Sequence, residues 1–298
     1  MKAIPALFIL IWSTGFIVAK LIAPVADPNL FLAVRMTLAA LLFLIIALAA
    51  RAPWPARRDV PKHVLAGVLL QGGYLGGTYW AVAQGLAPGV MALLGAIQPL
   101  LTAGLAILVL REIPTRRTWL GLLLGLGGVA LVMVPGLLAR GSTAMPLPVV
   151  AVAIAAVLSL TAGTVLQKTS IASADLRASS VLQNAGAAVA VGLLALARGE
   201  TRWVSGLTVW AALAWAALVL SGLGTFMLVW LIRRGRAANV ASLLLLAPPL
   251  AATESFLLFG DRLTAIQIAG FALALTGVFL CNPAQRARSS DTPVDSGA

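Results

Sequence analysis

Three side chains with hydrogen-bonding groups, Gln71, Tyr74 and Thr78, stand in a largely apolar stretch at residues 64–84 that contains no charged residue. Their spacing of i, i+3 and i+7 places them on one face of a helix, with Tyr79 beside that face. Such groups replace the hydrogen bonds that a small polar molecule loses when it leaves water, so the pattern predicts a cavity wall that binds a solute. The alternative is structural: the neighbouring glycines let helices approach closely, and the tyrosines lie at a boundary between apolar and aqueous surroundings.

Two other apolar stretches carry polar side chains of the same kind. Trp12 and Ser13 lie in the first apolar stretch of the chain, and Ser221 and Thr225 lie at i and i+4 in a later one. A shift of 150 residues places Gln71 on Ser221, so we expect the two faces to line a shared cavity. The alternative is that serine and threonine bond the backbone carbonyls of their own helices.

Prolines interrupt two further apolar stretches at equivalent positions, Gln98-Pro99 and Pro248-Pro249. A proline inside a helix frees a backbone carbonyl, which must find a partner within the protein or in a wet cavity. The pattern predicts hinges or carbonyl acceptors, with Gln98 as a further solute contact. The alternative is a kink that takes no part in any motion.

Two ionisable side chains, Arg35 and Glu254, lie within apolar stretches. Each costs about 3 kcal/mol or more in an apolar medium unless it is paired or wet. Arg35 could attract an anionic group such as a solute carboxylate, or extend to lipid headgroups. Glu254 could carry a coupled proton, pair with Arg35, or attract cations at the rim of a cavity. We expect both residues to serve in gating or coupling.

The sequence offers little for covalent chemistry. It contains no GxxxxGK[ST], HExxH or GxSxG motif, and Glu254 is the only acidic residue in the apolar stretches, whereas an intramembrane enzyme would need clustered Asp, Glu or His. The one cysteine, Cys281, excludes an internal disulfide, and the one histidine, His63, is expected to be solvated beside Lys62. We expect no enzyme, no cofactor and no metal, and keep a lipid-modifying enzyme or a scramblase as remote alternatives.

Composition places the chain in a lipid bilayer. It is 61% hydrophobic and 10% charged, with a mean hydropathy of +1.01, so its apolar side chains cannot all be hidden in a water-soluble core. One membrane-crossing helix needs roughly 20 residues. The charge-free runs are 3–19, 64–110, 118–139, 141–167, 178–197, 203–232 and 263–285. The run 64–110 must hold two helices, broken near Gly85–Gly89, and the stretches that carry Arg35 and Glu254 bring the expected number to ten.

The chain also contains an internal repeat, because the sequences of its two halves are related. Residues 79–100 and 229–250 are identical at 8 of 22 aligned positions, and the register continues at offsets of 148 and 149 elsewhere. Of the 21 Lys and Arg residues, 15 lie in alternate loops on the side of the N-terminus, 5 lie in the other loops, and Arg35 lies in a span. This asymmetry predicts that both termini are cytoplasmic, and it accounts for the net charge of +12 without a nucleic-acid partner. Five helices per half is an odd number, so the two repeats are inverted.

The two halves share a further arrangement of motifs. The first has Trp12-Ser13-Thr14-Gly15-Phe16, Lys20, Arg35, Pro99 and Arg111-Glu112, and the second has Pro249, Gly260-Asp261-Arg262-Leu263-Thr264 and Gly270 to Gly277. This arrangement resembles the EamA repeat of the drug/metabolite transporter superfamily over residues 3–283, and within it the YddG-like amino-acid exporters. The halves differ at Glu112, which is Asp261 in the second, and at Arg35, which is Gln183.

The expected fold is therefore an all-α membrane protein with ten transmembrane helices as two inverted five-helix repeats around a central cavity. The single domain spans 1–283, with repeats at 1–140 and 141–283 and a disordered cytoplasmic tail at 284–298. The resemblance implies a secondary transporter in the bacterial inner membrane that exports amino acids by alternating access, or else cationic drugs or other metabolites. Few fixed charges favour neutral or aromatic solutes and broad selectivity. A small-molecule substrate and the lipid bilayer are the expected partners, and a monomer is compatible with the sequence.

Overall fold

The computed structural model is helical almost throughout. It describes residues 3–86, 91, 94–111, 113–139, 146–169, 171–234, 242–259 and 264–281. Outside these ranges lie Glu112, Asp261, Arg262, the expected repeat boundary at 140 and the tail 284–298. The structure therefore does not test the predictions made for these residues.

In the part of the chain that the structure describes, the helical segments form ten rods. The first half has α1 (Ala3–Ile22), α2 (Pro28–Ala49), η1 (Arg57–Asp59) leading into α3 (Val60–Gly67), η2 (Val68–Gly73) and α4 (Tyr74–Ala83) as one rod, α6 (Gln98–Leu110) and α7 (Arg116–Ala139). The second half has α8 (Leu147–Thr169), α9 (Leu176–Ala197), a rod of α10 (Leu207–Ala214), η3 (Trp215–Gly224) and α11 (Thr225–Arg234), then η4 (Leu244–Leu246) with α13 (Ala247–Phe259), and α14 (Ala265–Cys281).

Four of these helical stretches are long and apolar enough to cross a membrane, namely Pro28–Ala49, Leu147–Thr169, Leu176–Ala197 and Leu207–Arg234. That the chain crosses the bilayer ten times, with both ends in the cytoplasm, stays a prediction.

Local sequence explains where several helices begin and end. Pro28 lies in the first turn of α2, where its missing N–H is not needed. The Asp175 carboxylate accepts hydrogen bonds from the backbone N–H groups of Arg177 and Ala178, which caps α9. The hydrogen bond from the Arg177 side chain, with these backbone bonds, holds the pKa of Asp175 below its usual range. Gly85, at φ +95°, follows the end of α4 in a backbone conformation that favours glycine.

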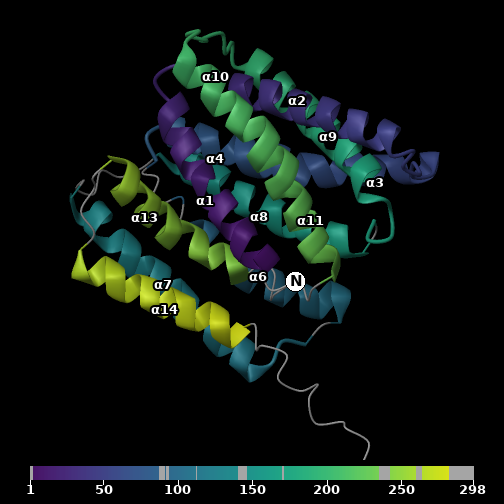
Figure 1. The fold of residues 1–298 in the computed structure, drawn as a ribbon. Helices are drawn as coiled ribbons and strands as arrows, with labels where there is room; N and C mark the ends of the chain where they lie inside the picture. The colour runs from purple at the N-terminus through teal and green to yellow at the C-terminus, as the bar shows by residue number, and fades with distance from the viewer. Residues whose placement is uncertain are drawn as a thin grey trace, which may run out of the picture.

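Most helix contacts join a helix of the first half to a helix of the second half. Equivalent helices lie along one another, α2 with α9 at one edge of the molecule and α7 with α14 at another (Figure 1). Between these pairs, η2 and α4 pack on α8, as η3 and α10 pack on α1. In the same way α6 packs on α8 while α13 packs on α1. This exchange is the contact pattern expected when two repeats are related by a two-fold axis.

The α7–α14 pair is held at backbone contact by glycines. A Cβ atom at Gly128 would lie 2.4 Å from the backbone nitrogen of Ala274, and one at Gly277 would lie 2.4 Å from that of Gly125. Nothing larger than glycine fits at either position without moving a helix.

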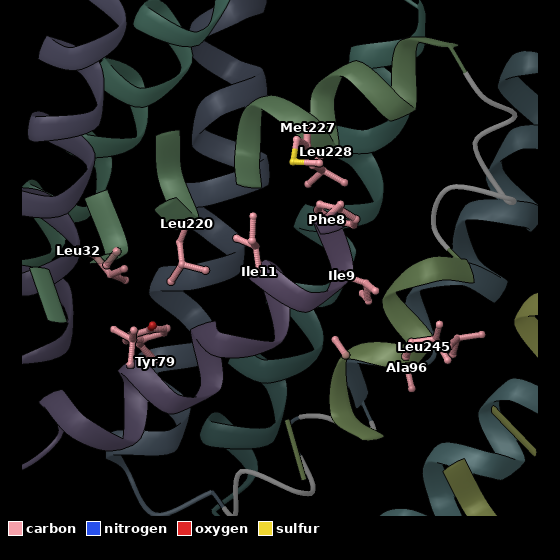
Figure 2. Close-up of a cluster of buried hydrophobic side chains, with 14 of the residues drawn as sticks. Phe8, Ile9, Ile11, Leu32, Tyr79, Ala96, Leu220, Met227, Leu228 and Leu245 are labelled. Carbon is pink, nitrogen blue, oxygen red and sulfur yellow. The ribbon is translucent and has the colours of Figure 1, made fainter. Parts of the chain in front are cut away.

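The apolar side chains divide between a buried cluster and the outer surface. Figure 2 shows the buried cluster gathered around α1, which contributes Phe8, Ile9 and Ile11. On the outside, Leu108 of α6 and its repeat equivalent Leu257 of α13 are 80% and 73% exposed. Exposed leucines at equivalent positions of both halves suit a lipid environment, where an apolar surface carries no cost.

A polar clamp joins the loop between α1 and α2 to the loop between α9 and α10. The backbones pair at Ala26 and Trp203. The Asp27 carboxylate accepts from the backbone N–H and the Nε–H of Arg202, at 2.8 and 3.2 Å. Glu200 accepts from the backbone N–H groups of Asn29 and Leu30 and so satisfies the N-terminus of α2. The two halves are thus tied together at this end of the bundle.

Candidate functional site

A small cavity opens where α1, α4 and α8 meet the two segments that precede α6 and α13. Its lining consists of Trp12, Tyr74, Thr78, Met91, Gly95, Ala96, Leu160, Leu244, Ala247 and Pro248. We refer to it as the Trp12–Tyr74 cavity. The cavity is partly open and has room for about two water molecules, so a larger solute can occupy it only after the surrounding helices move apart.

The lining of the Trp12–Tyr74 cavity is apolar and aromatic, with few polar groups. Its side chains carry no formal charge. The Thr78 hydroxyl is buried without a hydrogen-bond partner, and the Trp12 ring packs against Phe8 with 5.4 Å between ring centroids. A neutral or aromatic group could therefore stack on these rings and bond Thr78, as in ligand sites generally.

The rod that carries Tyr74 and Thr78 contains a π-helical stretch, η2, directly before Tyr74. The second half has its own π-helical stretch, η3, at the equivalent place. Ser159 of α8 donates to the Leu69 carbonyl within η2 at 2.9 Å, which satisfies a backbone group in the widened turn. Wide turns of this kind are frequent at functional sites.

The π-helical stretch corrects the predicted stripe on this rod. Tyr74 and Thr78 line the cavity, but Gln71 does not. A π turn holds more residues than an α turn, so Gln71 is rotated away from the face that a regular helix would give it. Gln71 is 3% exposed, and its side-chain nitrogen and oxygen have no partner.

The prolines lie where helical stretches are interrupted. A turn at residues 96–97 separates the helical residues 94–95 from α6, in whose first turn Pro99 lies. Pro248 and Pro249 lie in the first turn of α13, directly after the 3-10 turn η4. Gln98 donates to Thr102 Oγ1 at 2.7 Å along its own helix and does not line the cavity. Pro248 does line the cavity, so this helix start borders the candidate site.

Glu254 bonds to α1 and does not pair with Arg35. The hydroxyl of Ser13, which is fully buried, donates to Glu254 Oε1 at 2.5 Å, while Oε2 of Glu254 has no partner. Arg35 instead bonds Ser221, so the predicted Arg35–Glu254 pair is wrong. The two side chains serve different helix contacts: Glu254 joins α13 to α1, and Arg35 joins α2 to η3.

Arg35 is turned into the bundle rather than toward lipid headgroups. It is 4% exposed, and its Nε–H donates to Ser221 Oγ at 2.7 Å. The phenol of Tyr79 lies beside the guanidinium, and the Tyr79 hydroxyl also donates to the Gly15 carbonyl at 3.5 Å. The reading in which Arg35 extends to headgroups is therefore wrong, because this helix face packs on α4 and η3.

Several hydroxyl groups on the predicted faces bond their own helices. Thr225 donates to the Leu220 carbonyl at 3.2 Å, across the end of the π-helical stretch η3. Thr161 and Thr164 of α8 likewise donate to carbonyls four residues earlier. For Thr225 the alternative drawn from the sequence is the better one, because its hydroxyl bonds its own helix and it does not line the cavity.

The sequence analysis did not predict a buried polar network around His63, near the start of α3. His63 is 1% exposed rather than solvated, and its Nδ1 lies 2.8 Å from Ser179 Oγ. Ser179 Oγ also accepts from Arg233 at 3.0 Å and from Gln183 at 2.7 Å. Arg233 can only donate, and Gln183 directs its amide nitrogen at the same oxygen while its amide oxygen accepts from Gln167, so the Ser179 proton goes to His63. The imidazole is consequently neutral, with its own proton on Nε2.

This network joins residues that are far apart in the chain. Arg233 also donates to the Ala174 carbonyl, and Gln167 donates to Gln183 at 2.5 Å. It thereby fixes the ends of α3, α8, α9 and α11 against one another. One sequence signal was available, because Ser179 and Gln183 stand at i and i+4 on α9, with Ser180 and Asn184 repeating the same spacing one residue later. In the described ranges no three His, Cys, Asp or Glu residues gather as metal ligands would.

Comparisons with known proteins agree with this arrangement of two repeats. Residues 3–134 and residues 147–282 each match the profile of the EamA-like transporter family. An uncharacterized transporter of Synechocystis sp. is 26% identical over 292 residues, which cover 91% of this chain and 86% of the relative. One protein crystal structure superposes with a TM-score of 0.80 over 93% of this chain and 95% of its own, at 18% identity, and so shares the fold.

Proposed function

The chain belongs to the EamA-like transporter family, and we propose that it is a secondary transporter that exports amino acids across the bacterial inner membrane by alternating access. We place it with the YddG-like exporters and give it neutral and aromatic amino acids as substrates, with broad selectivity. The observation that carries the proposal is the Trp12–Tyr74 cavity, which combines two aromatic rings with an unbonded buried hydroxyl at Thr78. An amino-acid side chain can stack there without meeting a fixed charge.

The position of the cavity supports a transport role. It lies where helices of both halves meet the starts of α6 and α13, the two places where the chain interrupts its helices. In inverted-repeat transporters, substrate sites lie at the repeat interface beside interrupted helices. The cavity is too small for an amino acid in this conformation, so a transport cycle must widen it to admit a solute.

The first test is counterflow of labelled amino acids in proteoliposomes. We expect wild-type protein to exchange L-phenylalanine and L-leucine, and Tyr74→Ala to lower the rate at least tenfold because the cavity loses an aromatic wall. Tyr74→Phe keeps the ring and should retain most of the activity. Trp54→Ala removes an exposed aromatic far from the cavity lining and serves as the matched control. Exchange that survives Tyr74→Ala would place the substrate elsewhere, and exchange of no amino acid in a full panel would exclude this substrate class.

A second test concerns the source of energy. We expect Glu254→Gln to keep counterflow, because glutamine retains an oxygen for the Ser13 hydroxyl and removes a buried charge. Accumulation driven by an imposed pH gradient should be lost in the variant, because the coupling role expected of Glu254 needs a carboxylate that can take up a proton, and a variant that keeps this accumulation would exclude that role. If the variant keeps counterflow but loses accumulation driven by the pH gradient, Glu254 is the proton carrier and the transporter is an antiporter.

A further inference from the structure

We propose that Arg35 is the receptor for the carboxylate group of the transported solute, in a subsite formed by α2, α4 and η3 beside the Trp12–Tyr74 cavity. This inference rests on the proposed function, since it assigns the anionic end of an amino acid to one side chain. The cavity accommodates the apolar side chain of the substrate, and Arg35 binds the other end.

The first argument is the state of the Arg35 charge. The guanidinium has five N–H donors and is 4% exposed. Its recorded contacts are with neutral groups, the Ser221 hydroxyl at 2.7 Å and the adjacent Tyr79 phenol. Among the described residues no carboxylate lies within ion-pair distance of it. A buried cation without an anion is costly in a membrane protein and commonly marks a substrate or ion pathway.

The second argument uses the repeat as an internal control. The residue equivalent to Arg35 in the second half is Gln183, which carries no charge. The side chain of Gln183 has both ends engaged, donating to Ser179 at 2.7 Å and accepting from Gln167 at 2.5 Å. At the equivalent helix position, the second half therefore has a neutral amide whose nitrogen and oxygen are both hydrogen-bonded. The fold does not require a cation at this position, so the charge on Arg35 calls for another explanation.

The third argument is the position of Arg35 relative to the cavity. Tyr79, which lies beside Arg35, directly follows the cavity residue Thr78 in the chain. The Tyr79 hydroxyl contacts the Gly15 carbonyl on α1, one turn from the cavity residue Trp12. Figure 2 shows Tyr79 and Leu220 together beside α1, and the chain neighbour of Leu220 is Ser221, the partner of Arg35.

One contact between α4 and α1 near Arg35 is weak, because the Tyr79 hydroxyl lies 3.5 Å from the Gly15 carbonyl. In the proposed site, a shift of α1 against α4 that breaks this contact lets one solute reach both the cavity and the Arg35 guanidinium. That site would present aromatic rings at one end and a guanidinium at the other, which is the pattern of an amino acid with its carboxylate toward Arg35.

The experiment compares an acid with its uncharged counterpart. We would measure counterflow of L-phenylalanine and of L-phenylalaninamide, which lacks the carboxylate, for the wild type, Arg35→Gln, Arg35→Lys and the control Arg57→Gln. Arg35→Gln reproduces the residue that the second half uses, and Arg57 is exposed on the connection before α3. We expect the wild type to prefer the acid at least tenfold in KM. Arg35→Gln should lose that preference, Arg35→Lys should keep part of it, and Arg57→Gln should match the wild type.

The outcomes separate the two proposals. If the wild type moves phenylalanine but Arg35→Gln has the same KM for it, or if the wild type moves acid and amide equally well, Arg35 is not the receptor and the amino-acid exporter remains. If the wild type moves no amino acid, both proposals fall. If Arg35→Gln does not fold, the acid-to-amide ratio of Arg35→Lys and a thermal shift of the wild type with each compound decide the question. A shift with phenylalanine and none with its amide supports the receptor, and equal shifts overturn it.

Discussion

Gly128→Leu should lower the free energy of unfolding by about 3 kcal/mol, because the new side chain has no space between α7 and α14. The Cβ position lies 2.4 Å from the backbone nitrogen of Ala274 and 2.6 Å from the carbonyl oxygen of Gly270. Both are backbone atoms, so no rotamer change relieves the clash and the helices must separate. The measurement is thermal unfolding in detergent, followed by tryptophan fluorescence.

The adjacent residue gives the control for this prediction. A Cβ atom at Gly127 meets only the end of the Leu273 side chain at 3.8 Å, which is ordinary contact. Gly127→Leu should leave stability unchanged or raise it by about 0.5–1 kcal/mol, because leucine favours a helix more than glycine does. If both variants unfold at the same temperature as the wild type, the close contact of α7 and α14 does not exist in solution.

His63→Arg should destabilise the protein by about 3 kcal/mol, because it places a permanent charge inside the buried network around Ser179. The new guanidinium would face Arg233, and the Ser179 oxygen already accepts two hydrogen bonds. His63→Gln is the matched control, since its amide oxygen can accept the Ser179 proton while adding no charge. Equal stability of the two variants would show that the network does not constrain position 63.

The same network makes stability depend on pH. Burial, together with the nearby charges of Arg233 and Lys62, lowers the pKa of His63, and Asp59 opposes this effect only in part. A group whose folded pKa is lowered in this way stabilises the protein fully above the ordinary histidine pKa of about 6.5 and loses that effect as the pH falls. We expect the unfolding temperature to drop between about pH 7 and pH 5 in the wild type, and the drop to be smaller in His63→Gln. A profile that His63→Gln leaves unchanged would exclude this histidine as the cause.

Much of the fold could be predicted from the order of apolar stretches. The helices of the described residues follow those stretches. The internal repeat found in the sequence agrees with the two matches of the family profile, at residues 3–134 and 147–282. The prolines marked the places where the helical stretches before α6 and α13 are interrupted. These features depend on local composition and periodicity, which a sequence carries directly.

Side-chain partners were predicted less well, because they depend on how a helix is rotated. Arg35 and Glu254 both lie in apolar helices without a strong polar face, so the sequence could not say which way either one points. His63 stands next to Lys62, which favoured solvent, yet residues of α9 and α11 more than 100 positions later bury it. The π-helical turns gave no sequence signal at all, and they moved Gln71 off the predicted face.

These turns have a further consequence. A π turn contains one residue more than the α turn it replaces, and that surplus can pass to the next turn when one backbone hydrogen bond breaks and another forms. Each such step rotates the intervening side chains by about 100° and advances them by about 1.5 Å, while both ends of the rod stay in place. Because η2 and η3 occupy equivalent positions, the same combined rotation and advance of side chains is available in each half. We expect such a step to turn Gln71 and Ser221 toward or away from the interior of the bundle without displacing a whole helix.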